Sequence, residues 1–194
     1  MAPEEIVTFW LEEVGPSGWY KSEDSLDDQI RERFLQTWEE AREGAHGLWL
    51  MSAQGALAYL ILTDQFPRNM FRGSGDAFAT DPSARAVAYD AIEKGWDMDV
   101  PEPERQFFYM PMMHSEDMKD QDACVKLMAE RLTDPKVNNL LHAKAHRHII
   151  QRFGRFPYRN DALSRETTAD EANWMKNEGY SDCLLYTSPS PRDS

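Results

Sequence analysis

The sequence predicts an all-α fold, with about eight helices arranged as a compact bundle or helical array. Between its Gly and Pro residues, almost every segment repeats its apolar residues at the spacing of a helix. No window shows the sustained alternation of β-branched residues that is typical of strands. A hydrophobic content of 41% and six Trp residues are enough to build a continuous core.

The first two helices are predicted from breaks in the pattern and from one apolar stripe. A helix is expected over Pro3–Val14, because Gly15 and the Pro and Gly residues that follow it interrupt the pattern. Ser25 is expected to cap a second, long helix. The apolar stripe of this second helix consists of Ile30, Phe34, Trp38 and Ala41.

The middle of the chain predicts a central helix and then a helix rich in alanine. The segment Ser52–Gln65 is apolar on nearly all sides, so we expect other helices to surround it. Asp81 stands before Pro82, which is the pattern of a cap followed by a first-turn proline, and Gly95 closes the helix that they begin.

Three helices are predicted in the last part of the chain. Ser115 is expected to cap a helix over Ser115–Leu132, and an Asp-Pro pair begins another over Asp134–Phe153. Thr168 with Glu171 three residues later forms a capping box for a final helix that ends near Gly179.

One all-helical domain is expected over residues 1–182, followed by a disordered, non-native tail over residues 183–194. The stretch Cys183–Asp193 reads CLLYTSPSPRD and looks like the translation of a common sequencing adapter. The alternative is a genuine Ser/Pro-rich disordered tail. Without the tail, Cys124 is the only cysteine, which excludes an internal disulfide and a cysteine-based metal site.

The charge of the chain limits its partners. The 34 acidic and 21 basic residues give a net charge of -13, which would repel nucleic-acid phosphates and an anionic membrane surface. No stretch approaches the ~20 apolar residues of a membrane-spanning helix, and the acidic N-terminal residues do not resemble a signal peptide. We therefore expect a soluble, cytoplasmic protein that binds neither nucleic acid nor membrane, and the sequence leaves its oligomeric state open.

Two similar segments, Asp64–Asn69 (DQFPRN) and Gly154–Asn160 (GRFPYRN), each follow an apolar helical run. Pro67 and Pro157 are expected to end both helices alike, with the Asn of each loop tolerating a left-handed turn. Arginines concentrate in both loops, and guanidinium groups presented together suit a carboxylate or phosphate ligand. The alternative is structural: each Arg caps helix carbonyls and pairs with a nearby Asp.

The segment His114–Asp117 (HSED) stands at a predicted helix start. Capping by Ser115 and the favourable position of acidic residues in a first turn are sufficient to explain it. The functional alternative makes His114 a general base or a metal ligand beside two carboxylates, which would require a third partner from another helix.

His142 and His146 lie one helical turn apart, at a separation that lets two imidazoles share a metal. Ala143 stands where a zinc-protease helix would carry its glutamate base. Because His146 borders an apolar stripe, we interpret it as partly buried and hydrogen-bonded to a neighbouring helix or loop. We predict no metal site and no cofactor.

Four segments together resemble the bacterial family called domain of unknown function 924: LTDQFPRNMFRG, FATDPSARAVAYDAIEKGWD, FFYMPMMHSED and HRHIIQRFGRFPYRNDALSR. The likeness spans Glu4–Tyr180 and keeps the order and separations of the family's motifs. The family is similar in fold to tetratricopeptide-type helical proteins, and its biochemical activity is not established. The resemblance therefore implies a helical array but no reaction.

The resemblance also places the characteristic polar residues of the family in this chain. Two positions depart from the family pattern, because Tyr158 replaces the usual histidine of the second loop and Ser164 replaces a typical glycine. A mechanism that requires a histidine in that loop is not expected here. The positions that match are Asp64, Gln65, Arg68, Asn69, His114, Ser115, Glu116, His146, Arg155, Arg159 and Asn160.

The leading hypothesis is a non-enzymatic binding or scaffold domain. It would hold a small anionic ligand, an acidic peptide or another protein partner in a pocket formed by the two Phe-Pro loops and the His114 segment. A competing hypothesis is a metal-independent hydrolase or transferase, with proton transfer by His114 and Glu116 and anion stabilisation by Arg68 and Arg159. In a third hypothesis, the only role of these motifs is to hold the ends of helices together. The residues expected to bind the ligand are Asp64, Gln65, Arg68, Asn69, His114, Glu116, His146, Arg155, Arg159 and Asn160.

Overall fold

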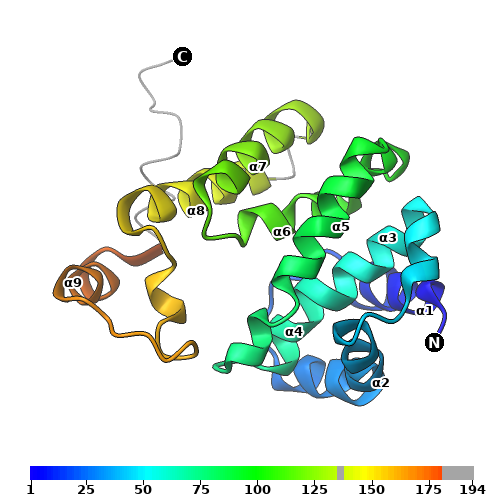
Figure 1. The fold of residues 1–194 in the computed structure, drawn as a ribbon, viewed down its shortest axis with the longest axis horizontal. Helices are drawn as coiled ribbons and strands as arrows, with labels where there is room; N and C mark the ends of the chain where they lie inside the picture. Colours follow the sequence, from blue (N-terminus) through cyan, green and yellow to red (C-terminus); the bar gives the residue numbers. More distant parts are fainter. Residues whose placement is uncertain (135–137, 181–194) are drawn as a thin grey trace. The chain divides into compact units, whose positions relative to one another are not determined.

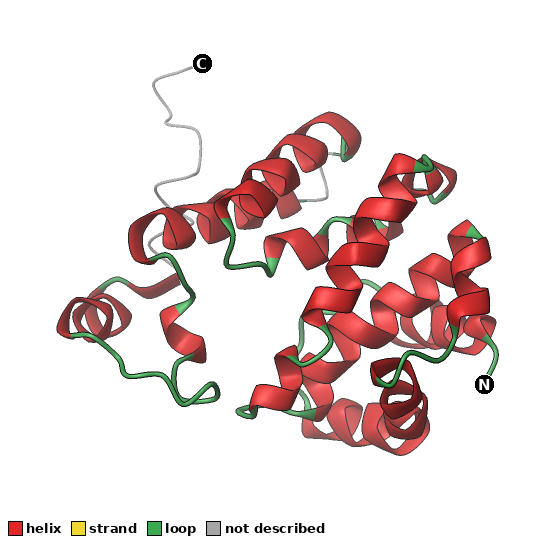
Figure 2. Cartoon of the chain, viewed as in Figure 1, coloured by secondary structure: helices red, strands yellow, loops and turns green. Residues whose placement is uncertain are grey.

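The computed structural model describes residues 1–134 and 138–180 of the chain. These residues form helices joined by short loops, and none of them lies in a strand (Figure 2). The all-α prediction is confirmed. The suspected adapter segment and the expected tail over residues 183–194 lie outside the described residues, as does the Pro135 start that was expected for the penultimate helix.

The chain divides into two compact units, a first unit over Met1–Pro111 and a second unit over Met112–Ser194, and each is described by itself. The single domain expected over residues 1–182 stays a prediction. The first unit contains α1 (Pro3–Thr8), α2 (Asp24–Arg42), α3 (Ala53–Leu60), α4 (Phe66–Met70) and α5 (Asp81–Glu93), as Figure 1 shows. The second contains α7 (Met118–Arg131), α8 (Asn139–Phe153) and α9 (Ala169–Asn177), and α6 (Met110–Met113) includes the boundary.

The core of the first unit is built around α3, as the apolar pattern predicts. Every residue from Gly55 to Pro67 is buried, and α3 packs against α1 and α5 while α2 packs against α4. Aromatic rings fill the space between these helices: Phe34 lies 4.8 Å from Phe66 and 5.0 Å from Phe9, measured between ring centroids. The predicted stripe of α2 faces this core, since Ile30, Phe34, Trp38 and Ala41 are all buried.

The first Phe-Pro loop does not end its helix, and the prediction that both loops act alike was wrong. Phe66 keeps helical dihedrals (φ -60°, ψ -38°), and the chain passes from α3 through a π-helical turn over Ile61–Gln65 directly into α4. Pro67 has no N–H to donate to the carbonyl of Thr63, four residues earlier. That carbonyl accepts a 2.6 Å hydrogen bond from the hydroxyl of Thr80 instead, which satisfies the group that proline leaves open.

The second Phe-Pro loop does end its helix. The final residue of α8 is followed by Gly154 in the left-handed region (φ 70°), and Phe156 is extended (φ -89°, ψ 105°) before Pro157. The left-handed turn expected at Asn160 is absent, because Asn160 has φ -58° and ψ -46°. Ser164 adopts the left-handed conformation instead, with φ 53°.

Replacing Ser164 with glycine is expected to stabilise the protein by up to about 1 kcal/mol. A Cβ atom at positive φ is strained, and the gain is limited because glycine is also freer in the unfolded chain. Urea unfolding of the parent and of Ser164→Gly measures the difference. Ser164→Ala, which keeps the Cβ atom, is the control, and a Gly variant no more stable than the Ala variant would contradict the strain argument.

Three predicted caps are displaced and one is confirmed. The helix α2 begins at Asp24, so Ser25 lies inside its first turn, and α5 begins at Asp81 with Thr80 in the cap position. The helix α7 is capped by Asp117, whose side chain accepts from the Lys119 N–H, rather than by Ser115. The capping box of Thr168 at the start of α9 is present as predicted.

The second unit has its own apolar core beneath α8 and α9. In Figure 1, α7 and α8 lie side by side, and the two helices pack along each other. The buried cluster consists of Ala145, Ile149, Ile150, Phe156 and Trp174. Phe156, from the second Phe-Pro loop, is therefore a core residue that ties the loop to α8 and α9. Among residues 1–134 and 138–180, no helix has the length and apolar character needed to span a bilayer.

Candidate functional site

The residues expected to bind a ligand are divided between the two units. The first unit holds Asp64, Gln65, Arg68 and Asn69. The second unit holds His114, Glu116, His146, Arg155, Arg159 and Asn160.

Arg68 is held by carboxylates of its own unit. Its guanidinium donates two hydrogen bonds of 3.0 Å to the carboxylate of Asp81, lies 3.4 Å from the Asp64 carboxylate and also donates to the Asp64 carbonyl. Asp64 and Asp81 are buried, with exposures of 1% and 6%. A bidentate pair of this kind fixes both partners, which agrees with the structural alternative for this loop.

The remaining polar residues of the first loop also bind within the unit. The carboxylate of Asp27, on α2, accepts from the Asn69 side-chain amide at 2.8 Å and from two guanidinium nitrogens of Arg72. The Gln65 amide donates to the Asp64 carboxylate at 2.5 Å. These contacts join α2, α4 and the start of α5 into one network.

Glu116 anchors the second loop to the His114 segment. Its carboxylate accepts two hydrogen bonds from Arg165, at 2.7 and 3.0 Å, and one from the backbone N–H of Phe156 at 2.8 Å. Burial alone would raise the pKa of Glu116, but these hydrogen bonds outweigh it and lower the pKa below its ordinary value. Glu116 is thus a carboxylate at neutral pH with fixed internal partners.

Glu171, the third residue of α9, is a second anchor of the loop. It accepts two hydrogen bonds from Arg155, at 2.6 and 2.8 Å, one from the Thr168 N–H and one from the Asn160 side chain. The Arg155 hydrogen bonds, more than any other contact, lower the pKa of Glu171 to about 2. Arg155 and Asn160 therefore have defined structural partners.

Three histidines lie near one another in the second unit. His142 and His146 come from successive turns of α8, and the ring of His114 lies 6.3 Å from that of His146, between centroids. The His146 ring makes T-shaped contacts with the rings of Phe156 and Tyr180, each at 5.3 Å between centroids. This group of side chains combines the aromatic surface of Phe156 and Tyr180 with the nitrogens of the imidazole rings.

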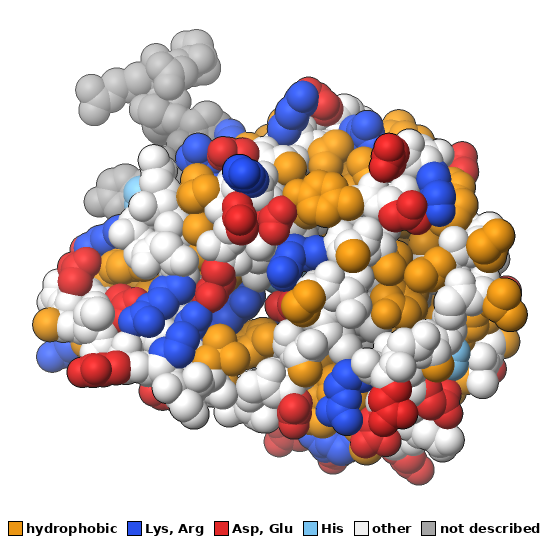
Figure 3. All heavy atoms as spheres, in the orientation of Figure 1, with side chains coloured by type: hydrophobic (Ala, Val, Ile, Leu, Met, Phe, Trp, Pro, Cys, Tyr) orange, Lys and Arg blue, Asp and Glu red, His pale blue; other side chains and the backbone are white. Residues whose placement is uncertain are grey.

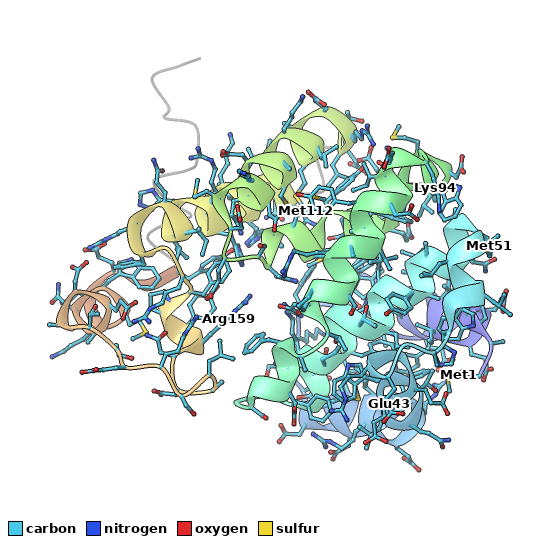
Figure 4. All side chains as sticks on the ribbon, in the orientation of Figure 1. Met1, Glu43, Met51, Lys94, Met112 and Arg159 are labelled. Carbon is cyan, nitrogen blue, oxygen red and sulfur yellow. The ribbon has the colours of Figure 1, made fainter. Side chains whose placement is uncertain are left out.

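Arg159 adds a positive charge to this group. Its guanidinium lies 4.4 Å from the centre of the Phe156 ring, and the residue is buried, with 7% exposure. Figure 4 shows it on the segment after α8. Burial, together with the charges of His114 and Arg159, lowers the pKa of His146 to about 3. His146 is therefore neutral at physiological pH.

The structure gives no support to a shared metal. In the part of the chain that it describes, no group of three or more His, Cys, Asp or Glu side chains is placed to hold a metal ion. The Nδ1 atoms of His142 and His146 are both engaged: the first contacts the Tyr180 hydroxyl at 2.8 Å, and the second contacts the His142 carbonyl at 2.9 Å.

Several partners in these networks were missed by the sequence analysis. Neither Asp27 nor Tyr180 was singled out, and Asp81 and Glu171 were considered only for their helix starts. Asp27 lies 45 residues from Arg72, and Glu116 lies 49 residues from Arg165. Sequence spacing carries no signal for such contacts. Tyr158, in the second loop, is 47% exposed and stacks on Phe156 at 5.4 Å, measured between ring centroids.

The acidic charge of the protein is concentrated in the first unit. Residues 1–111 carry nine basic and 21 acidic side chains, whereas residues 112–180 carry eleven of each. Figure 3 shows basic side chains gathered over the loop between α8 and α9, with acidic side chains among them. The repulsion that the net charge predicts for an anion is therefore weaker at the second unit.

The comparisons with known proteins agree with this all-helical structure. The family model DUF924, bacterial protein of unknown function, matches residues 6–179. The solved structure of ATU0120 from Agrobacterium tumefaciens, a protein of unknown function, is similar with a TM-score of 0.84. It has 40% sequence identity, over 90% of this chain and 96% of that one. No curated protein matches the chain. The chain belongs to the DUF924 family of bacterial proteins.

Proposed function

We propose that this protein is a binding or scaffold domain whose second unit holds a small anionic ligand beside His114, His146 and Arg159. The observation that carries the proposal is that the His146 ring lies beside both the His114 ring and the Phe156 ring, while the Arg159 guanidinium lies over the same Phe156 ring. Guanidinium and imidazole groups attract carboxylates and phosphates, and a partly buried position strengthens that attraction. The balanced charge of residues 112–180 repels an anion less than the acidic first unit does.

The other arginines of the loops are assigned a structural role in this proposal. Arg155 and Arg165 form bidentate pairs with Glu171 and Glu116, and Arg68 does the same with Asp81. Breaking such a pair to bind a ligand would leave a carboxylate without its partner. The proposed ligand site therefore contains fewer residues than the ten that the sequence indicates.

The enzymatic alternative receives less support from the same contacts. A general acid must hold a proton that it can give away, and the lowered pKa of Glu116 keeps this group ionised. We also propose a cytoplasmic location and a tetratricopeptide-like arrangement. The second of these is supported by the packing of α7 against α8.

Thermal unfolding with a panel of carboxylates and phosphates tests the proposal, with Arg159→Ala and Arg147→Ala in parallel. Arg147 is the control because it lies on α8 and pairs with the exposed Asp122. A ligand at ~100 times its Kd stabilises the native state by about 2.7 kcal/mol. We expect this shift in the parent and in Arg147→Ala, and its loss in Arg159→Ala. An unchanged midpoint of the parent with every anion would contradict the proposal.

A further inference from the structure

The hydrogen bonds of His146 define where its proton lies. Its Nδ1 atom is 2.9 Å from the backbone carbonyl of His142, one turn earlier in α8. A carbonyl oxygen can only accept a hydrogen bond, so Nδ1 must carry the proton. The low pKa of this ring keeps it neutral, and a neutral imidazole has one proton. The Nε2 atom of His146 therefore has a free lone pair.

Tyr180 supports the same assignment. Its hydroxyl oxygen lies 3.3 Å from His146 Nδ1, where it can accept a second, longer hydrogen bond from the same N–H. The hydroxyl also lies 2.8 Å from His142 Nδ1, and burial lowers the pKa of His142. A neutral His142 with its proton on Nε2 accepts from the Tyr180 O–H, so every contact in the group has one donor and one acceptor.

The lone pair of His146 lies in unusual surroundings. Among the described residues, His146 makes no hydrogen bond through Nε2. Its neighbours include His114 and Arg159, whose charges disfavour a proton on His146. An anion attracted to the Arg159 guanidinium would meet, at His146 Nε2, a nitrogen that accepts a hydrogen bond but has no proton to donate.

Resting on the proposed function, we infer that the ligand is an oxyanion that also carries a hydroxyl proton, such as hydrogen phosphate. Its charged oxygens are attracted by Arg159, and its O–H donates to His146 Nε2. A fully deprotonated oxyanion of the same shape would place a lone pair against a lone pair. The tautomer of His146 thus selects the protonation state of the ligand.

Inorganic phosphate and sulfate provide the test, with the full chain at mildly alkaline pH. There, phosphate is mainly the doubly charged hydrogen phosphate, so the two ions match in charge and shape and differ by one proton. Isothermal titration calorimetry is expected to show that phosphate binds about tenfold more tightly than sulfate. One hydrogen bond to an anionic ligand contributes about this much to the affinity. Equal affinities would overturn this inference but leave the anion site in place, whereas no binding of either ion would overturn both.

A variant and a spectroscopic measurement identify His146 as the origin of the preference. His146→Gln is expected to bind both ions alike, because its amide can present either its oxygen or its nitrogen. His148→Gln is the matched control, since His148 is exposed on the same helix, and it should keep the preference. Circular dichroism establishes that each variant is folded.

The tautomer can be read in the parent protein without any substitution. Nuclear magnetic resonance of nitrogen-15-labelled histidine distinguishes the two neutral forms of the ring. We expect His146 to be neutral with its proton on Nδ1. A proton on Nε2, or a charged ring at neutral pH, would overturn the inference even if His146→Gln did not fold.

Discussion

Arg68→Ala is expected to lower the free energy of unfolding by about 3–5 kcal/mol, the cost of removing one partner from a buried ion pair. Arg68 compensates two carboxylates at once, and both Asp64 and Asp81 are more than nine-tenths buried. Without the guanidinium, each carboxylate must either stay ionised with no bond to Arg68 or take up a proton, and either outcome costs stability. Urea unfolding followed by circular dichroism measures the loss.

Lys94→Ala is the matched control for Arg68→Ala. Lys94 forms an ion pair of similar length with Asp90 in the same unit, at 2.6 Å, but both side chains are about half exposed. Exposed pairs contribute no more than about 1 kcal/mol, so this variant should remain close to the parent. If the two variants lost equal stability, the network around Arg68 would not have the structural role assigned to it. Adding Asp81→Ala to Arg68→Ala should recover part of the loss, since one of the uncompensated carboxylates is then gone.

The fold was predictable because the helical spacing of apolar residues identifies a helix even where the residue that caps it is assigned wrongly. The apolar stripe of α2 and the buried run around α3 identify elements whose packing is determined by many residues together. A cap depends on one residue, so Ser25 and Ser115, each a favourable cap in isolation, were assigned to the wrong position. The effect of Pro67 could not be predicted from local sequence either. It depends on Thr80, whose hydroxyl donates to the Thr63 carbonyl, 17 residues earlier in the chain.

The candidate site was predictable only as a set of residue types. Sequence analysis identified the density of arginine but not the contacts of each arginine. Arg155 and Arg165 have bidentate carboxylate partners, and the Arg159 guanidinium lies over the ring of Phe156. The tautomer of His146 depends on a carbonyl of its own helix, a contact that the spacing of His142 and His146 allows but does not require.

Trp174→Ala is expected to destabilise the second unit by about 3–5 kcal/mol, the usual cost of deleting a fully buried large aromatic side chain. Trp174 is 2% exposed and attaches α9 to the core through Phe153, whose ring lies 5.2 Å away, and through the cluster that includes Phe156. The helix α9 has nine residues, too few to be stable alone. Its amides should therefore lose protection against hydrogen exchange.

The same substitution tests how the second loop is held. Glu171 is on α9 and binds Arg155 and Thr168, so a detached α9 would release the loop that carries Arg159. Met175→Ala is the control on the same helix, because Met175 is 38% exposed, and it should cost no more than about 0.5 kcal/mol. If Trp174→Ala left α9 protected and anion binding intact, the ion pairs of Glu171 would hold this helix without the core. The position of Arg159 would then depend on electrostatic contacts rather than on apolar packing.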